Sequence, residues 1–253
     1  MTPQILAALA AVEREHAVRV LFAAESGSRA WGFASPDSDY DVRFVYVHAR
    51  DWYLRLGEPR DVIEQMLPDD LDVSGWDLRK ALRLFARSNI ALYEWLGSPI
   101  VYREDPAFAV PARELIARHF QPAAALHHYL GTARTTFHEH LSGETVRLKK
   151  VFYFLRPILA CRWIEQTRTQ PPTAFAELVA ADWVHADERT TIAELQHRKQ
   201  LASEADREAL DPTLAQWMRD QLEHYARIGP SLARRTEGNL DELDSLMIAL
   251  CDR

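Results

Sequence analysis

Residues 25–42, with the sequence ESGSRAWGFASPDSDYDV, determine how the first part of the chain folds. Before them lies VRVLFAA (18–24), an apolar and β-branched run typical of a buried strand. YDVRFVYV (40–47) is a second run of this kind. Gly27 and Ser28 end the first strand in a turn, and a loop with Gly, Ser and Pro connects it to the second. We therefore expect two strands joined by a loop that carries polar residues.

The same patterns extend outward from these strands. Residues 3–16 predict a helix, and 61–66 and 70–74 predict two short strands around a turn at 67–69. Helices are expected after Asp77 and after Asn89, strands end near residue 102, and the rest to residue 228 is mostly helical. The predicted fold class is α+β: a small α/β head with a mixed sheet (1–105) and an α-helical C-terminal domain (106–253) that closes a cleft.

Composition limits the class of protein. The 253 residues carry 30 Lys plus Arg against 37 Asp plus Glu, a net charge of −7, and 47% are hydrophobic. This excludes a disordered tail and disfavours a surface that binds nucleic acid everywhere. We expect no membrane span and no signal peptide. Cys161 and Cys251 alone make no disulfide framework or zinc site, so we expect reduced thiols and a cytoplasmic protein.

Asp39 and Asp41 stand at the head of the second strand. Their spacing places both carboxylates on one face of the sheet, where they repel each other unless a cation lies between them. A hard divalent ion bound by carboxylate and phosphate oxygens meets this need, so we expect Mg²⁺, with Mn²⁺ as the alternative. Asp72 is placed to supply a third carboxylate. Asp70 competes for this role, and Asp77 is expected to cap the next helix.

The Gly-Ser turn is suited to phosphate. Gly27 lets the backbone approach a ligand closely, and Ser28 adds a hydroxyl and an N–H group. Arg29 follows directly and is a candidate phosphate ligand, with a structural role as the alternative. Arg43 shares the strand face of the two aspartates, where its structural role would be a salt bridge that neutralises them.

Gly27-Ser28 followed by Asp39-Tyr-Asp-Val42 resembles the signature of the DNA polymerase β-like nucleotidyltransferase superfamily. The surrounding segments, GSRAWGF (27–33) and DSDYD (37–41), resemble those of one branch of this superfamily. That branch is the predicted nucleotidyltransferases that include the RNA-ligase-associated, RNA-repair polymerase-like proteins. Residues 74–102 and 148–163 are similar to that branch too. The resemblance covers roughly residues 18–165.

The resemblance implies roles for individual residues. Gly27 and Ser28 would hold the triphosphate of an incoming nucleotide, and Asp39 and Asp41 would bind the catalytic Mg²⁺ ions. Asp72 matches the third carboxylate, which activates the attacking hydroxyl as a general base. The attack would fall on the α-phosphate and release pyrophosphate.

The helical stretch 147–162 is basic within an acidic chain. It carries five Lys or Arg side chains and no acid. Helical spacing places Lys149, Tyr153 and Arg156 on one face, which favours a wall that binds nucleotide phosphates or RNA. The alternative is a helix whose basic side chains extend to solvent.

Together these observations predict a Mg²⁺-dependent enzyme that moves a nucleoside monophosphate from an NTP, such as ATP, to an acceptor hydroxyl. An RNA 3′ end in RNA repair is the first acceptor expected from the resemblance, with an RNA ligase as pathway partner. Two alternatives stay open. One is an antitoxin-like enzyme that modifies a protein, and the other is a non-catalytic module that binds nucleotide or RNA.

Overall fold

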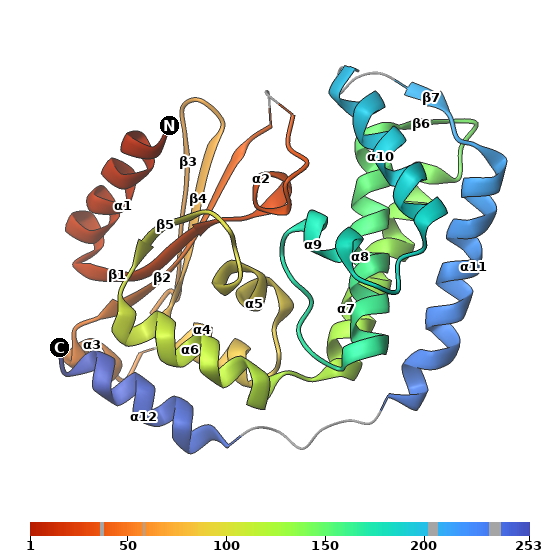
Figure 1. Cartoon of the computed structure of the whole chain (residues 1–253). Helices are drawn as coiled ribbons and strands as arrows, with labels where there is room; N and C mark the ends of the chain where they lie inside the picture. Colours follow the sequence, from red (N-terminus) through yellow and green to blue (C-terminus); the bar gives the residue numbers. More distant parts are fainter. Residues whose placement is uncertain (36–37, 58, 202–206, 233–238) are drawn as a thin grey trace. The chain divides into compact units, whose positions relative to one another are not determined.

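The computed structural model describes all residues except 36–37, 58, 202–206 and 233–238 (Figure 1). Contacts within the chain define two compact units. Unit 1 comprises Met1–His119 and Thr236–Arg253, and unit 2 comprises Phe120–Arg235. Pro36 and Asp37, which the sequence assigns to the connecting loop, lie outside the described residues.

A mixed five-stranded sheet organises unit 1. Its strand order is β3-β4-β2-β1-β5, and β2 and β4 run parallel whereas the other neighbours are antiparallel. This confirms the predicted α+β class with a mixed sheet. The strands are β1 (Val18–Glu25), β2 (Tyr40–His48), β3 (Val62–Leu67), β4 (Leu71–Asp77) and β5 (Val101–Glu104).

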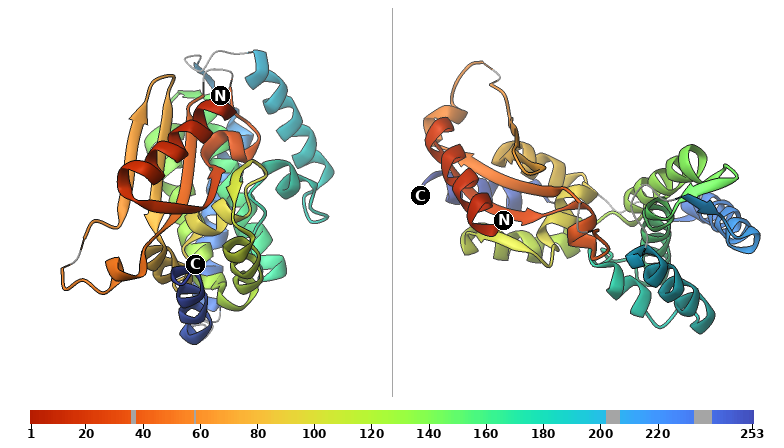
Figure 2. Two further views of the ribbon diagram at one scale, coloured as in Figure 1. Left: turned by 90° about the vertical axis from the view of Figure 1, so that its left-hand side faces the viewer. Right: turned by 90° about the horizontal axis from the view of Figure 1, so that it is seen from above.

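Helices cover both faces of this sheet, and α1 lies in front of the strands in the left view of Figure 2. The first helix, α1, packs against one face through Ile5, Leu9 and Val12, which meet Phe44 and Tyr46 of β2 in one buried cluster. On the other face α4 contacts β2 and β4, while α5 and α6 contact β1. The helices of the first 119 residues are α1 (Thr2–His16), α2 (Gly27–Trp31), α3 (Arg50–Tyr53), α4 (Leu78–Ala86), α5 (Ile90–Leu96) and α6 (Pro106–His119).

Capping side chains set where two of these helices begin. Asp77 accepts a hydrogen bond from the backbone N–H of Arg79 at 2.9 Å and so caps α4. Asn89 accepts one from the N–H of Leu92 at 3.1 Å and caps α5. Both starts agree with the sequence, because short polar side chains satisfy the free N–H groups of a first helical turn.

The chain ends in α12 (Leu240–Cys251), which belongs to unit 1 and packs on α4, α6 and β2. Arg19 of β1 donates to the carbonyl of Leu250 at 2.9 Å, which ties the two ends of the chain together. The division by contacts thus differs from the sequence-based boundary at 105/106, since both α6 and α12 pack on the sheet unit.

Unit 2 is predominantly helical, and α7 and α8 form its largest contact. The predicted end of strands near residue 102 is wrong, because a two-stranded sheet, β6 with β7, lies in this unit. Among the described helices, none is both long and apolar enough to cross a membrane. The elements of unit 2 are α7 (Pro122–Thr136), η1 (Phe137–Leu141), β6 (Thr145–Arg147), α8 (Leu148–Thr167), α9 (Phe175–Ala180), α10 (Ala186–Leu201), β7 (Arg207–Ala209), α11 (Pro212–Ile228) and η2 (Gly229–Ser231).

Candidate active site

The turn between β1 and α2 lies directly against Asp41. Gly27 begins α2 with φ at +61°, a left-handed conformation that favours glycine. A Cβ atom at Gly27 would stand only 2.3 Å from Oδ2 of Asp41. The backbone N–H of Ser26 donates to the carbonyl of Asp41 at 2.8 Å. The Gly-Ser turn and the strand that carries Asp41 therefore lie against each other, while their joint role in binding stays a prediction.

Parallel pairing of β2 with β4 brings Asp41 and Asp72 together. The two residues are direct partners in the register of the strands. One nitrogen of Arg43, Nη2, lies 2.9 Å from Oδ1 of Asp41 and 2.8 Å from Oδ2 of Asp72. All three side chains are half-buried. Two carboxylates thus converge on a point where a guanidinium offsets their repulsion, and the ion pair foreseen for Arg43 is confirmed for Asp41.

Arg29 organises the loop that carries Asp39. Its guanidinium donates to the backbone carbonyls of Ser38 at 2.6 Å and Asp39 at 3.1 Å. It also lies over the ring of Tyr40, with 3.7 Å between Cζ and the ring centroid. Asp39 itself is exposed at the head of β2. Arg29 therefore has the structural role that the sequence left as an alternative, while its contact with a phosphate stays a prediction.

The structure separates Asp72 from Asp70, its competitor for the role of third carboxylate, and from Asp77. Asp70 lies in the turn before β4 with φ at +53°, and its carbonyl accepts from the N–H of Tyr40 at 2.9 Å. Asp77 is buried, caps α4, and accepts from the hydroxyl of Tyr53 at 2.7 Å. Burial raises the pKa of the Asp77 carboxyl. Asp72 is the one of the three that pairs with Asp41.

The donor set suits a hard divalent cation. Asp41 and Asp72 present carboxylate oxygens to the same nitrogen, and the glycine at position 27 lets the backbone of the turn lie directly against Asp41 Oδ2. Asp39 stands two residues before Asp41 with its side chain exposed, and its place as a third carboxylate stays a prediction. Within the described residues no three acidic, His or Cys side chains already form a metal-holding group. The residues fit Mg²⁺ by chemistry, with two of the three carboxylates already together.

The basic residues of α8 lie in unit 2. Arg156 is 3% exposed, and its guanidinium donates to the carbonyl of Thr173 at 3.2 and 3.3 Å. Lys149 and Tyr153 are half-buried on the same helix. Of the three residues of α8 that were predicted to bind nucleotide, Lys149 and Tyr153 are the two that keep exposed surface.

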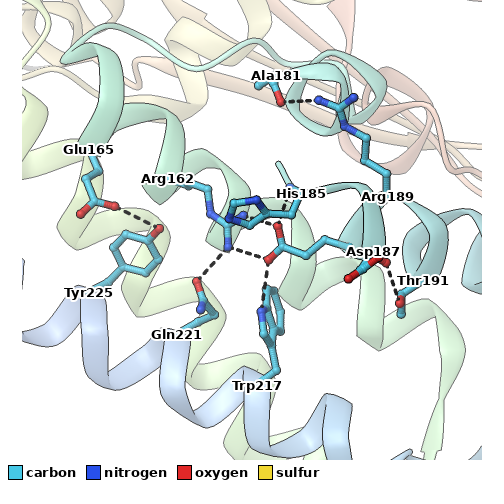
Figure 3. Close-up of polar contacts among 11 residues, drawn as sticks. Arg162, Glu165, Ala181, His185, Asp187, Arg189, Thr191, Trp217, Gln221 and Tyr225 are labelled. Carbon is cyan, nitrogen blue, oxygen red and sulfur yellow. Dashed lines mark hydrogen bonds and ion pairs between the residues drawn. The ribbon is translucent and has the colours of Figure 1, made fainter. Parts of the chain in front are cut away.

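Another arginine of this helix is held by a network inside unit 2 (Figure 3). Arg162 makes a two-pronged ion pair with Glu188 of α10, at 2.6 and 2.9 Å, and donates to Gln221 of α11 at 3.2 Å. Trp217 donates to the same carboxylate at 3.2 Å. Part of the positive charge of the 147–162 segment thus serves to join α8, α10 and α11.

Glu25 is a site residue that sequence reasoning did not identify. It ends β1 fully buried, and its Oε1 accepts from the backbone N–H of Asp41 at 2.8 Å. Its other oxygen accepts from the Tyr102 hydroxyl of β5. Burial is the main cause that raises the pKa of this carboxyl. The available signal was an acidic residue at the end of an otherwise apolar strand, two residues before the glycine of the Gly-Ser turn.

A mixed sheet with two strand-borne aspartates beside a Gly-Ser turn is consistent with the DNA polymerase β-like class that the sequence resembles. The comparisons with known proteins agree. The chain belongs to the RNA repair pathway DNA polymerase beta family (RlaP), whose model matches residues 1–249. It is also 42% identical over 252 residues to the uncharacterized protein YcgL of Bacillus subtilis (strain 168), covering 98% of this chain and 95% of that protein.

Gly27→Ala tests the contact between turn and strand. The new methyl group would collide with the Asp41 carboxylate, in addition to a backbone strain of roughly 1–2 kcal/mol at positive φ. Gly32→Ala is the matched control, since Gly32 has φ at +86° and open space around its Cβ position. Urea unfolding and Mn²⁺ binding should show a larger loss for Gly27→Ala. Equal losses in both variants would mean that the turn does not contact Asp41.

Glu25→Gln tests the buried carboxyl. Because the folded-state pKa lies above the ordinary value of 4.5, protonation favours the fold. The contribution of Glu25 to stability is therefore full below about pH 4.5 and is lost as pH rises through the raised pKa of the folded state. The free energy of unfolding of the wild type should fall relative to Glu25→Gln across this window, in urea titrations at several pH values.

Glu104→Gln is the control of opposite sign. Its hydrogen bond with Arg113 lowers the pKa of Glu104, so the advantage of the wild type over this variant should shrink as pH falls. A difference between wild type and Glu25→Gln that does not change with pH would contradict a buried, protonatable Glu25.

Proposed function

We propose that this protein is a Mg²⁺-dependent nucleotidyltransferase that moves a nucleoside monophosphate from an NTP to the 3′-hydroxyl of RNA during RNA repair. The observation that carries the proposal is the convergence of Asp41 and Asp72 on one point. This point lies beside the Gly-Ser turn, where Gly27 has no side chain that would collide with Asp41. Membership in the RNA repair pathway DNA polymerase beta family supports it. An RNA ligase that seals the repaired end is the pathway partner in this proposal.

The residues of the turn bind the triphosphate in this proposal. Gly27 allows phosphate oxygens to approach the backbone, and Ser28 adds its N–H and hydroxyl. Asp39, Asp41 and Asp72 are the residues that would hold Mg²⁺, which when bound offsets the triphosphate charge and aligns it for in-line attack. Arg29 holds the loop at Asp39 in place, because its guanidinium donates hydrogen bonds to the backbone carbonyls of Ser38 and Asp39.

Asp72 is the general base of the proposed reaction. Its carboxylate takes the proton of the RNA 3′-hydroxyl while the hydroxyl oxygen bonds to the α-phosphorus of the nucleotide. The bond between that phosphorus and the bridging oxygen of the β-phosphate breaks, and pyrophosphate leaves with the electron pair. Glu25 supports this step indirectly, because it holds the backbone N–H of Asp41.

Transfer is tested with the purified full chain, each α-labelled NTP, and Mg²⁺ or Mn²⁺. The acceptors are an RNA with a 3′-hydroxyl, the same RNA with a 3′-deoxy end, and a cell extract. Asp41→Asn and Asp72→Asn should each lower incorporation by about 10²-fold or more, because each removes a carboxylate from the site.

Asp70→Asn is the matched control two residues away. Asn tolerates the left-handed turn conformation of Asp70, so this variant should keep both fold and activity. If label from the nucleotide is found only in protein, the acceptor is a protein and the proposed RNA acceptor is wrong. No incorporation under any of these metal conditions would favour a binding module, and loss in Asp70→Asn but not in Asp72→Asn would overturn the role of Asp72.

A further inference from the structure

A cavity lies in unit 1, away from the aspartates. It has a volume of about 270 Å³ and is bounded by the end of α1, the end of β2, α3 and β3. Tyr46 of β2 lines it, and alternation along β2 places Tyr46 on the face that packs against α1, opposite Asp41. At about 3.3 Å per residue, Tyr46 stands roughly 16 Å along the strand from Asp41.

The hydroxyl of Tyr46 is buried and, within the described part of the chain, has no hydrogen-bond partner. The neighbouring carboxylate of Asp77 is already used, since one oxygen accepts from the Tyr53 hydroxyl and the other from the N–H of Arg79. Burial raises the pKa of Tyr46, which keeps the hydroxyl protonated. A buried donor without an acceptor is costly, so this group points to a missing partner.

The other lining residues describe the shape and charge of that partner. His48 and Trp52 stack at 3.8 Å between ring centroids, with their planes 9° apart, and form an aromatic wall. Burial lowers the pKa of His48 to about 4, so its imidazole is neutral at pH 7. Arg60 is paired with Glu64 at 2.8 Å. The lining thus combines an aromatic wall and a neutral imidazole with the buried hydroxyl of Tyr46, while the charge of Arg60 is offset by Glu64.

We propose that this cavity binds a nucleobase, with its edge hydrogen-bonded to the Tyr46 hydroxyl and its ring against the aromatic wall. The volume suits a base or nucleoside and is small for a larger ligand. The aromatic side chains provide the stacking that single-stranded bases use on proteins. This proposal is independent of the proposed transfer reaction, because it concerns the opposite face of the sheet and requires no metal.

Binding of the four nucleosides to the full chain, without metal, tests the proposal by calorimetry and saturation-transfer NMR. A short single-stranded oligoribonucleotide is the second arm, which distinguishes a free nucleoside from a base within RNA. Tyr46→Phe removes only the hydroxyl and should weaken binding about tenfold or more. It should also raise the melting temperature, since a buried group without a partner is lost.

Tyr93→Phe is the matched control. Tyr93 is equally buried, but its hydroxyl donates to the carbonyl of Phe85 at 2.8 Å and it does not line the cavity. This variant should lower the melting temperature and leave binding unchanged. Asp41→Ala should also bind nucleosides normally, which separates this site from the transfer site. No binding at about millimolar concentration, or binding that Tyr46→Phe leaves intact, would overturn the proposal.

Discussion

A single nitrogen of Arg43, shared by the carboxylates of Asp41 and Asp72, marks the point on which the candidate site depends. The two aspartates meet there because β2 and β4 run parallel with these residues in register. A shift of one residue in that pairing would turn one carboxylate to the α1 face, into the apolar cluster around Phe44. The sheet topology is therefore a condition for the chemistry as well as for the core.

Asp41 is held from several sides at once. Its backbone N–H is bound by Glu25, its carbonyl by the N–H of Ser26, and its carboxylate by Arg43. Gly27 closes the remaining side without a side chain. Such fixed geometry lowers the cost of organising a charged site, since the carboxylate does not have to be ordered when a ligand binds.

Local patterns predicted much of this unit, whereas long-range pairing limited the rest. Strand periodicity placed Asp39 and Asp41, and the caps Asp77 and Asn89 follow from side-chain chemistry close in sequence. The short strand β5 forms only because β1 pairs with it, and α12 returns to the sheet unit after more than a hundred residues in unit 2. Glu25 had a local signal in its place at the end of an apolar strand, but its hydrogen bond with Tyr102 of β5 is a long-range contact that no local pattern could reveal.

The central claim is that Asp39, Asp41 and Asp72 hold a metal against a triphosphate at the Gly-Ser turn. A crystal structure of the full chain with Mg²⁺ and a non-hydrolysable NTP tests it most directly. The account predicts carboxylate oxygens of these residues about 2.0–2.1 Å from Mg²⁺ and phosphate oxygens against Gly27 and Ser28. A nucleotide bound elsewhere, with Arg43 still joined to both Asp41 and Asp72, would contradict it.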